Sequence, residues 1–107
     1  MKILEYQAFT PTTAIYPKDY AMAYLSTGIA AEAGEVAGAY AKFFRGDYTR
    51  EQLLKILKKE LGDVLWFISQ ICNEEGLSIE EDVIHTNVNK LTSRSERGVL
   101  KGSGDDR

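Results

Sequence analysis

The chain has 107 residues, of which 44% are hydrophobic and 27% charged, with a formal net charge of −3 at pH 7. This length supports one hydrophobic core, and the composition is that of a globular domain and not of a disordered chain. The acidic balance gives no electrostatic reason to expect nucleic acid or an anionic membrane as a partner. The single cysteine, Cys72, excludes an intramolecular disulfide, and no apolar run approaches the roughly 20 residues of a membrane span. We therefore expect one cytoplasmic domain over residues 1–107.

Helical signals fill most of the chain. We expect an extended arm or short helix over residues 4–9, and three main helices over about 18–45, 49–75 and 78–97. Pro17 is typical of a helix N-terminus, whereas Gly46 and Gly76 are typical of the residue that follows a helix. Thr49 and Ser78 each begin a capping box, in which a side chain three residues on bonds back to the start of the helix. The class is all-α: a helical bundle of three main helices with a short N-terminal segment, assembling as an oligomeric bundle.

Two pairs of carboxylates lie inside the most apolar of these segments. Glu32 and Glu35 are three residues apart in the first long helix, as are Glu60 and Asp63 in the second. At about 100° per residue, Glu32 and Glu60 project within the apolar stripes of their helices, while Glu35 and Asp63 lie at the margins. Charges inside an apolar stripe must be paired, neutralised or bound to metal. An ordinary solvated surface does not account for this pattern.

The spacing also brings the two pairs to the same height. Ten residues lead from Glu35 to Arg45 and eleven from Thr49 to Glu60, which is about 15 and 16 Å of helix. If the short link makes an antiparallel hairpin, the four carboxylates converge. They repel one another unless a cation lies among them, and all-oxygen ligands favour Mg²⁺ or Mn²⁺. In the alternative, a salt-bridge cluster, Lys42 on the same face neutralises one charge but not four.

At these residues the chain resembles the MazG-like nucleotide pyrophosphohydrolases, within the all-α NTP pyrophosphatase superfamily. The signature of that family is Glu-Glu-x-x-Glu, a gap, then Glu-x-x-Asp, and residues 31–35 and 60–63 occupy it here with 24 residues between them. The likeness covers about residues 20–97 and includes the phrases ELGDVLWF and NVNKLTSR. It implies hydrolysis of a (deoxy)nucleoside triphosphate to its monophosphate and pyrophosphate, with Mg²⁺ held by Glu32, Glu35, Glu60 and Asp63.

One position departs from the signature, because Ala31 stands where the family has its first Glu. In some relatives that position is a candidate for activating the attacking water. Here either Glu32 or Glu35 takes the proton, or the water loses it without a dedicated base. Both alternatives stay open, and Glu32 and Glu35 are the candidate catalytic residues.

A polar and basic stripe follows the apolar stripe of the last helix. Asn87, Lys90 and Arg94 recur there at helical spacing. A matching Asn and Lys contact substrate in the family, so the resemblance implies that this stripe binds phosphates and sugar. Lys42 and Arg45 are further candidates for phosphate contacts. The alternative is a solvated helix edge. The glycine-rich residues 98–107 are a flexible tail or a flap over the phosphates.

The second long helix carries an apolar stripe of about 180°, wider than a simple bundle needs. Three helices in a chain of this length cover only part of that stripe, and the rest would cause association. We therefore expect a homodimer, or a tetramer formed as a dimer of dimers; in the alternative, the N-terminal arm covers the face of a monomer. Trp66, off the main stripe, stacks on a base, contacts a subunit or packs in the core.

Two other functions compete with the pyrophosphohydrolase. The first is a non-catalytic oligomeric helical metal-binding protein, for which Ala31 is the main support. The second is a metal-storage or di-iron carboxylate bundle, which is disfavoured because such sites use Glu-x-x-His pairs and the only histidine, His85, is far from both motifs. Disposal of aberrant nucleotides (house-cleaning) and control of normal pools both stay open as roles.

Overall fold

The computed structural model describes residues 1–107, and every regular element in it is helical. The elements in chain order are α1 (Ile3–Phe9), η1 (Thr10–Thr13), η2 (Lys18–Tyr20), α2 (Ala21–Arg45), α3 (Arg50–Glu75), η3 (Ile79–Ile84) and α4 (His85–Glu96). The elements η1 and η2 are 3₁₀-helices, and η3 is a π-helix that leads directly into α4. The predicted all-α class is confirmed. None of the helices combines the length and the apolarity needed to cross a membrane.

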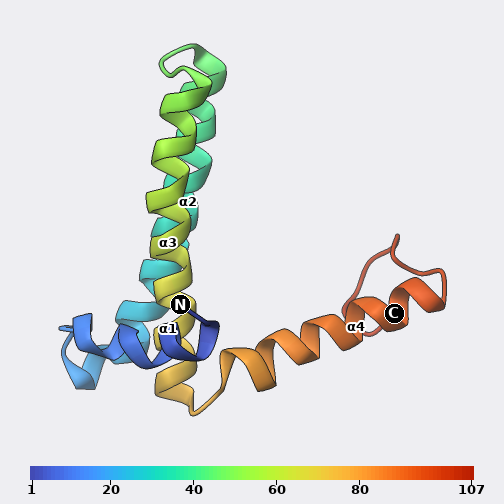
Figure 1. Ribbon diagram of the computed structural model, residues 1–107. Coiled ribbons are helices and arrows are strands. Elements are labelled where there is room, and N and C mark those ends of the chain that lie inside the picture. The colour runs from blue at the N-terminus through green and yellow to red at the C-terminus, as the bar shows by residue number, and fades with distance from the viewer.

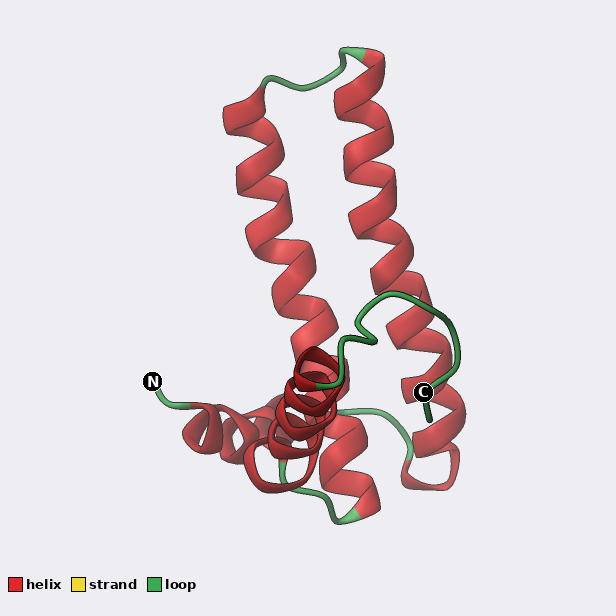
Figure 2. Ribbon diagram, turned by 90° about the vertical axis from the view of Figure 1, so that its right-hand side faces the viewer, coloured by secondary structure: helices red, strands yellow, loops and turns green.

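The helices α2 and α3 form a long antiparallel hairpin (Figures 1 and 2). Gly46 ends α2 with a φ of 94°, a left-handed conformation that favours glycine, and its N–H bonds to the carbonyl oxygens of Lys42 and Phe43. Thr49 caps α3: its hydroxyl accepts from the N–H of Gln52 at 3.2 Å, and the Gln52 side chain accepts from the N–H of Thr49 at 2.8 Å. Both predicted boundaries of the link are therefore confirmed.

Small and branched side chains hold the hairpin together. Near the turn, Ala39 packs with Leu53 and Leu57 in a buried core. Farther from the turn, Gly28 of α2 lies directly against Phe67 of α3, and a Cβ atom at position 28 would overlap the Phe67 ring. That ring is itself fixed, because it lies against other aromatic rings in and beside the hairpin. Glycine at position 28 is thus required by space, not by backbone conformation.

Replacing Gly28 with Ala is expected to lower the free energy of unfolding by about 1–3 kcal/mol, the usual cost of overpacking a close interface. Phe67 cannot move aside freely, since its ring centroid lies 5.7 Å from that of Tyr24 and 5.1 Å from that of Trp66. Urea denaturation followed by circular dichroism measures the change. Gly34→Ala in the same helix is the control, because nothing lies within 4 Å of a Cβ there. That control should gain up to about 1 kcal/mol, and equal stability of the two variants would contradict the close approach.

The N-terminal arm, residues 1–17, packs across the end of the hairpin that lies away from the turn (Figure 1). Its first residues form the short helix α1, one of the two predicted alternatives. Thr10 is fully buried, and its hydroxyl lies 2.7 Å from both the Ser69 hydroxyl and the side-chain oxygen of Gln70. Gln7 donates to the carbonyl of Leu77 at 2.7 Å. Buried polar groups therefore fasten the arm to α3 and to the link that follows it.

The last helix leaves the hairpin and projects to one side (Figure 1). Ser78 caps the segment as predicted, with its hydroxyl accepting from the N–H of Glu81 at 3.1 Å. The return bond to the N–H of Ser78 comes from Asp82 at 2.7 Å, one residue later than a regular capping box would place it. This shift accompanies the wider π-helical start of the segment. Within one chain only two of the three predicted main helices pack side by side, and the oligomeric bundle remains a prediction.

Candidate metal centre

Three carboxylates meet on the inner face of the hairpin. Glu32 comes from α2, and Glu60 and Asp63 come from successive turns of α3. One oxygen from each of the three lies within 4.8 Å of the other two. Glu32 and Glu60 are half-buried, whereas Asp63 is exposed. The structure thus brings the two sequence motifs to the same height, as residue counting from the turn predicts.

Glu35, the fourth carboxylate expected at this point, lies outside the group of three. It is exposed on α2, one turn from Glu32. Its charge still contributes to a raised pKa at Glu32, so it lies close enough to interact with the group. Because Glu35 lies at the margin of the apolar stripe of α2, it is exposed where Glu32 is half-buried, and three carboxylates converge here instead of four.

The group of three carries uncompensated negative charge. Burial raises the pKa of the Glu32 carboxyl, and the charges of Asp63 and Glu60 raise it further. None of these side chains forms an ion pair within 4.0 Å, and neither does Lys42. The structure therefore shows no salt-bridge cluster at this place. Oxygen donors in this number, held close together without a protein counter-charge, suit a hard divalent cation.

A pocket of about 380 Å³ opens beside the carboxylates. Its walls combine two acidic, three aromatic and two N-terminal side chains: Glu32, Asp63, Tyr24, Trp66, Phe67, Thr13 and Ile15. Sequence reasoning identified the acidic members and weighed Trp66 as a base contact, but it missed Thr13 and Ile15. No local pattern marks these two residues, because the arm reaches the pocket only through long-range packing against α3.

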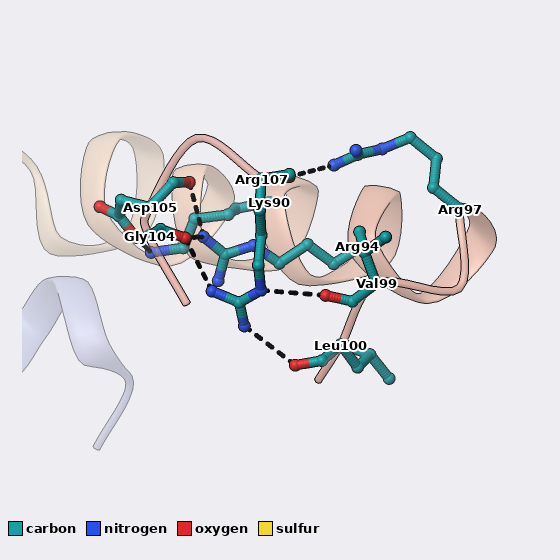
Figure 3. A network of polar contacts seen from close by, with 8 residues as sticks. All are labelled: Lys90, Arg94, Arg97, Val99, Leu100, Gly104, Asp105 and Arg107. Carbon is teal, nitrogen blue, oxygen red and sulfur yellow. Dashed lines mark hydrogen bonds and ion pairs between the residues drawn. The ribbon is translucent and has the colours of Figure 1, made fainter. Parts of the chain in front are cut away.

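Within one chain, the predicted polar and basic stripe on α4 lies away from this pocket. On α4, Lys90 bonds to the carboxylate of Asp105 at 3.1 Å, and Arg94 bonds to the same carboxylate at 3.2 Å and to the Asp105 carbonyl at 2.6 Å (Figure 3). These cations hold the pKa of Asp105 below its usual value. Asn87 is exposed on the same helix. The structure does not bring Asn87, Lys90 and Arg94 to the carboxylates of their own chain, and Lys42 is an exposed residue nearer the hairpin turn.

The fold and the site together define the class of protein: an all-helical hairpin with a group of carboxylates between its two long helices. Residues 22–99 match the MazG nucleotide pyrophosphohydrolase domain. The gene 37 protein of Mycobacterium phage L5 is 39% identical over 111 positions, which cover 95% of this chain and 96% of that protein. No solved structure matches the chain. The chain therefore belongs to the MazG nucleotide pyrophosphohydrolase family.

Proposed function

We propose that the protein hydrolyses nucleoside or deoxynucleoside triphosphates to the monophosphate and pyrophosphate, with Mg²⁺ as its cofactor. The observation that carries the proposal is the group of Glu32, Glu60 and Asp63 beside a partly aromatic pocket, in a chain of the MazG family. Mn²⁺ shares the preference for oxygen ligands and is the expected substitute. The two candidate roles, house-cleaning and control of normal pools, use the same reaction.

The residues present fit such a cation. Glu32, Glu60 and Asp63 would hold it, and Glu35, which is one turn from Glu32 and contributes to the raised pKa of that carboxyl, is the candidate fourth ligand. A bound divalent cation neutralises phosphate charge and makes water a stronger nucleophile at neutral pH. Because the carboxyl of Glu32 binds a proton more tightly than an ordinary glutamate, that proton competes with the cation for the site.

The attacking water must lose a proton, and the chain offers two acceptors. Glu32 lies inside the group of three and Glu35 outside it. Glu35 is the better placed, since it lies outside the group of three and is exposed to incoming water. Ala31 cannot serve, because it has no titratable group. The proposal thus gives the catalytic role to Glu35, with Glu32 as the alternative acceptor.

The phosphates also need cations from the protein. Lys42 lies on the same helix as Glu35, two turns away, and makes no ion pair that would hold it back. Asn87, Lys90 and Arg94 are too far away within one chain, so we propose that the stripe on α4 reaches the carboxylates of a neighbouring subunit. In that arrangement Lys90 and Arg94 exchange the carboxylate of Asp105 for phosphate oxygens.

Product analysis tests the reaction. The purified protein with Mg²⁺ and each common dNTP and NTP should release pyrophosphate and the monophosphate, since attack at the α-phosphorus expels both distal phosphates together. Nucleoside diphosphates should be poor substrates. A diphosphate and orthophosphate as main products would contradict attack at the α-phosphorus. Mg²⁺ binding with no turnover of any nucleotide would favour the second candidate function, a non-catalytic metal-binding oligomer, which the absent carboxylate at Ala31 supports.

A further inference from the structure

The N-terminal arm enters the pocket although it lies outside residues 22–99, the part that matches the family. It supplies Thr13 and Ile15 to the same pocket that the carboxylates of Glu32 and Asp63 line. The indole Nε1–H of Trp66 donates to the hydroxyl oxygen of Thr13 at 2.8 Å. The N-terminal arm, which has no part in the family signature, therefore contacts Trp66 at the pocket.

Further hydrogen bonds within the arm, and from the arm to α3, support the contact between Thr13 and Trp66. The hydroxyl of Thr13 donates to the carbonyl of Thr10 at 3.0 Å, which leaves its oxygen free to accept from the indole. Thr10 itself is fully buried and bonded to Ser69 and Gln70 on α3. A chain of hydrogen bonds thus leaves α3, passes through two threonines of the arm and returns to α3 at Trp66. Such linked bonds reinforce one another and fix the orientation of the ring.

The Trp66 ring lines the pocket beside the carboxylates. Trp66 follows Asp63 by three residues, so the two side chains lie on the same face of α3, one turn apart. The rings of Phe67 and Tyr16 stand nearly perpendicular to it, at 80° and 83°. Trp66 remains half-exposed at the pocket, and Ile15, which lines the same pocket, is 96% exposed. An aromatic and an aliphatic surface left open beside a group of carboxylates form a place for a flat apolar ring.

We propose that the N-terminal arm forms the base-binding side of this site: Trp66 and Ile15 hold the nucleobase, and Thr13 is the positioning residue that fixes the Trp66 ring. This inference rests on the proposed function, which brings a nucleotide to the carboxylates. The nucleobase is the flat and weakly polar part of that substrate, whereas its phosphates belong at the acidic side with the cation. The arm contributes to recognition of the base and takes no part in the transfer of the phosphoryl group.

Three variants of the arm test the inference. Thr13→Val removes the acceptor for the indole N–H, and Thr13→Ser keeps it. Thr12→Val is the matched control, because the Thr12 hydroxyl also donates to a backbone carbonyl of the arm, that of Phe9 at 2.7 Å, without touching Trp66. For Thr13→Val we expect KM for dNTPs to rise roughly fivefold, the value of one neutral hydrogen bond, with kcat changed less than about twofold. Thr13→Ser and Thr12→Val should keep the KM of the wild type.

Trp66 is the only tryptophan, so the protein has a single indole N–H signal in its NMR spectrum. That signal should move in Thr13→Val and not in Thr12→Val. In the wild type it should respond to deoxynucleoside monophosphates and not to inorganic tripolyphosphate, which carries no base. An indole signal that ignores all nucleotides, or equal KM values for Thr13→Val and Thr12→Val, would overturn the inference while leaving pyrophosphate release intact. If the protein cleaves no triphosphate but the signal responds to monophosphates, the proposed function fails and the base contact stands.

Discussion

Replacing Asp63 with Asn is expected to reduce Mg²⁺-dependent pyrophosphate release by more than about 100-fold, because a lost ligand should cost more than the 10–100-fold typical of an outer-shell partner. Asp63 supplies one of the three oxygens that lie within 4.8 Å of one another, and Asn keeps its shape without its charge. Mg²⁺ binding followed by calorimetry should be lost together with activity. The metal-free variant should melt no lower than the wild type, because the substitution removes a charge that repels Glu32.

Asp19→Asn is the control for this experiment, since Asp19 is an exposed carboxylate in η2 with no ion pair. It should bind Mg²⁺ and release pyrophosphate as the wild type does. Undiminished Mg²⁺-dependent turnover in Asp63→Asn would end the assignment of the metal centre. Glu35→Gln, measured in parallel, separates the two roles of Glu35: loss of metal binding identifies a ligand, and loss of turnover with metal binding retained identifies the proton acceptor.

We expect the protein to purify as a homodimer or as a dimer of dimers. One chain of 12.0 kDa exposes 7624 Å², whereas a compact monomer of this mass exposes about 6,000 Å². Its radius of gyration is 16.7 Å, against about 13 Å for a compact chain of this length. The excess of about 1,600 Å² per chain corresponds to the interface of an obligate oligomer. The projecting α4 contributes to it, since Val88 and Leu91 are 51% and 44% exposed there.

Light scattering coupled to size exclusion measures the assembly directly. Leu91→Asp on the apolar face of α4 should shift the protein toward the mass of one chain and lower pyrophosphate release, because the basic stripe would no longer reach a neighbouring site. Thr92→Asp is the control: it places the same charge on the next residue, which is exposed and outside the apolar stripe. A wild-type protein with the mass of one chain at micromolar concentration and full activity would rule out the dimer.

The parts of the fold that follow from local chemistry were predictable from the sequence. Gly46 and Thr49 act through their own backbone and their nearest neighbours, so the boundaries of the hairpin follow from them alone. The meeting of Glu32 with Glu60 and Asp63 follows from counting residues on either side of the turn. Periodicity also placed the polar and basic stripe on one helix, because a helix repeats its faces without reference to the rest of the chain.

The remaining parts depend on contacts between distant residues. Thr13 reaches the pocket because buried polar groups attach the arm to α3, and nothing near Thr13 in the sequence signals that attachment. The direction of α4 depends on the link after Gly76 and on the π-helical turn, neither of which hydrophobic periodicity describes. Glu35 lies one helical turn from Glu32, and counting residues does not show that only Glu32 joins Glu60 and Asp63.

The hairpin also determines where the chain tolerates changes of length. The core of Ala39, Leu53 and Leu57 lies between the turn and the carboxylates. One residue inserted between Glu32 and Ala39 would rotate these positions by about 100° and shift them by about 1.5 Å relative to each other, so either the core or the carboxylate group would lose its alignment. Residues added at the turn, after Gly46, lie beyond both and disturb neither. Insertions and deletions among natural relatives should therefore gather at the turn and the chain ends, and the turn is the place where a reporter sequence can be inserted with the site left intact.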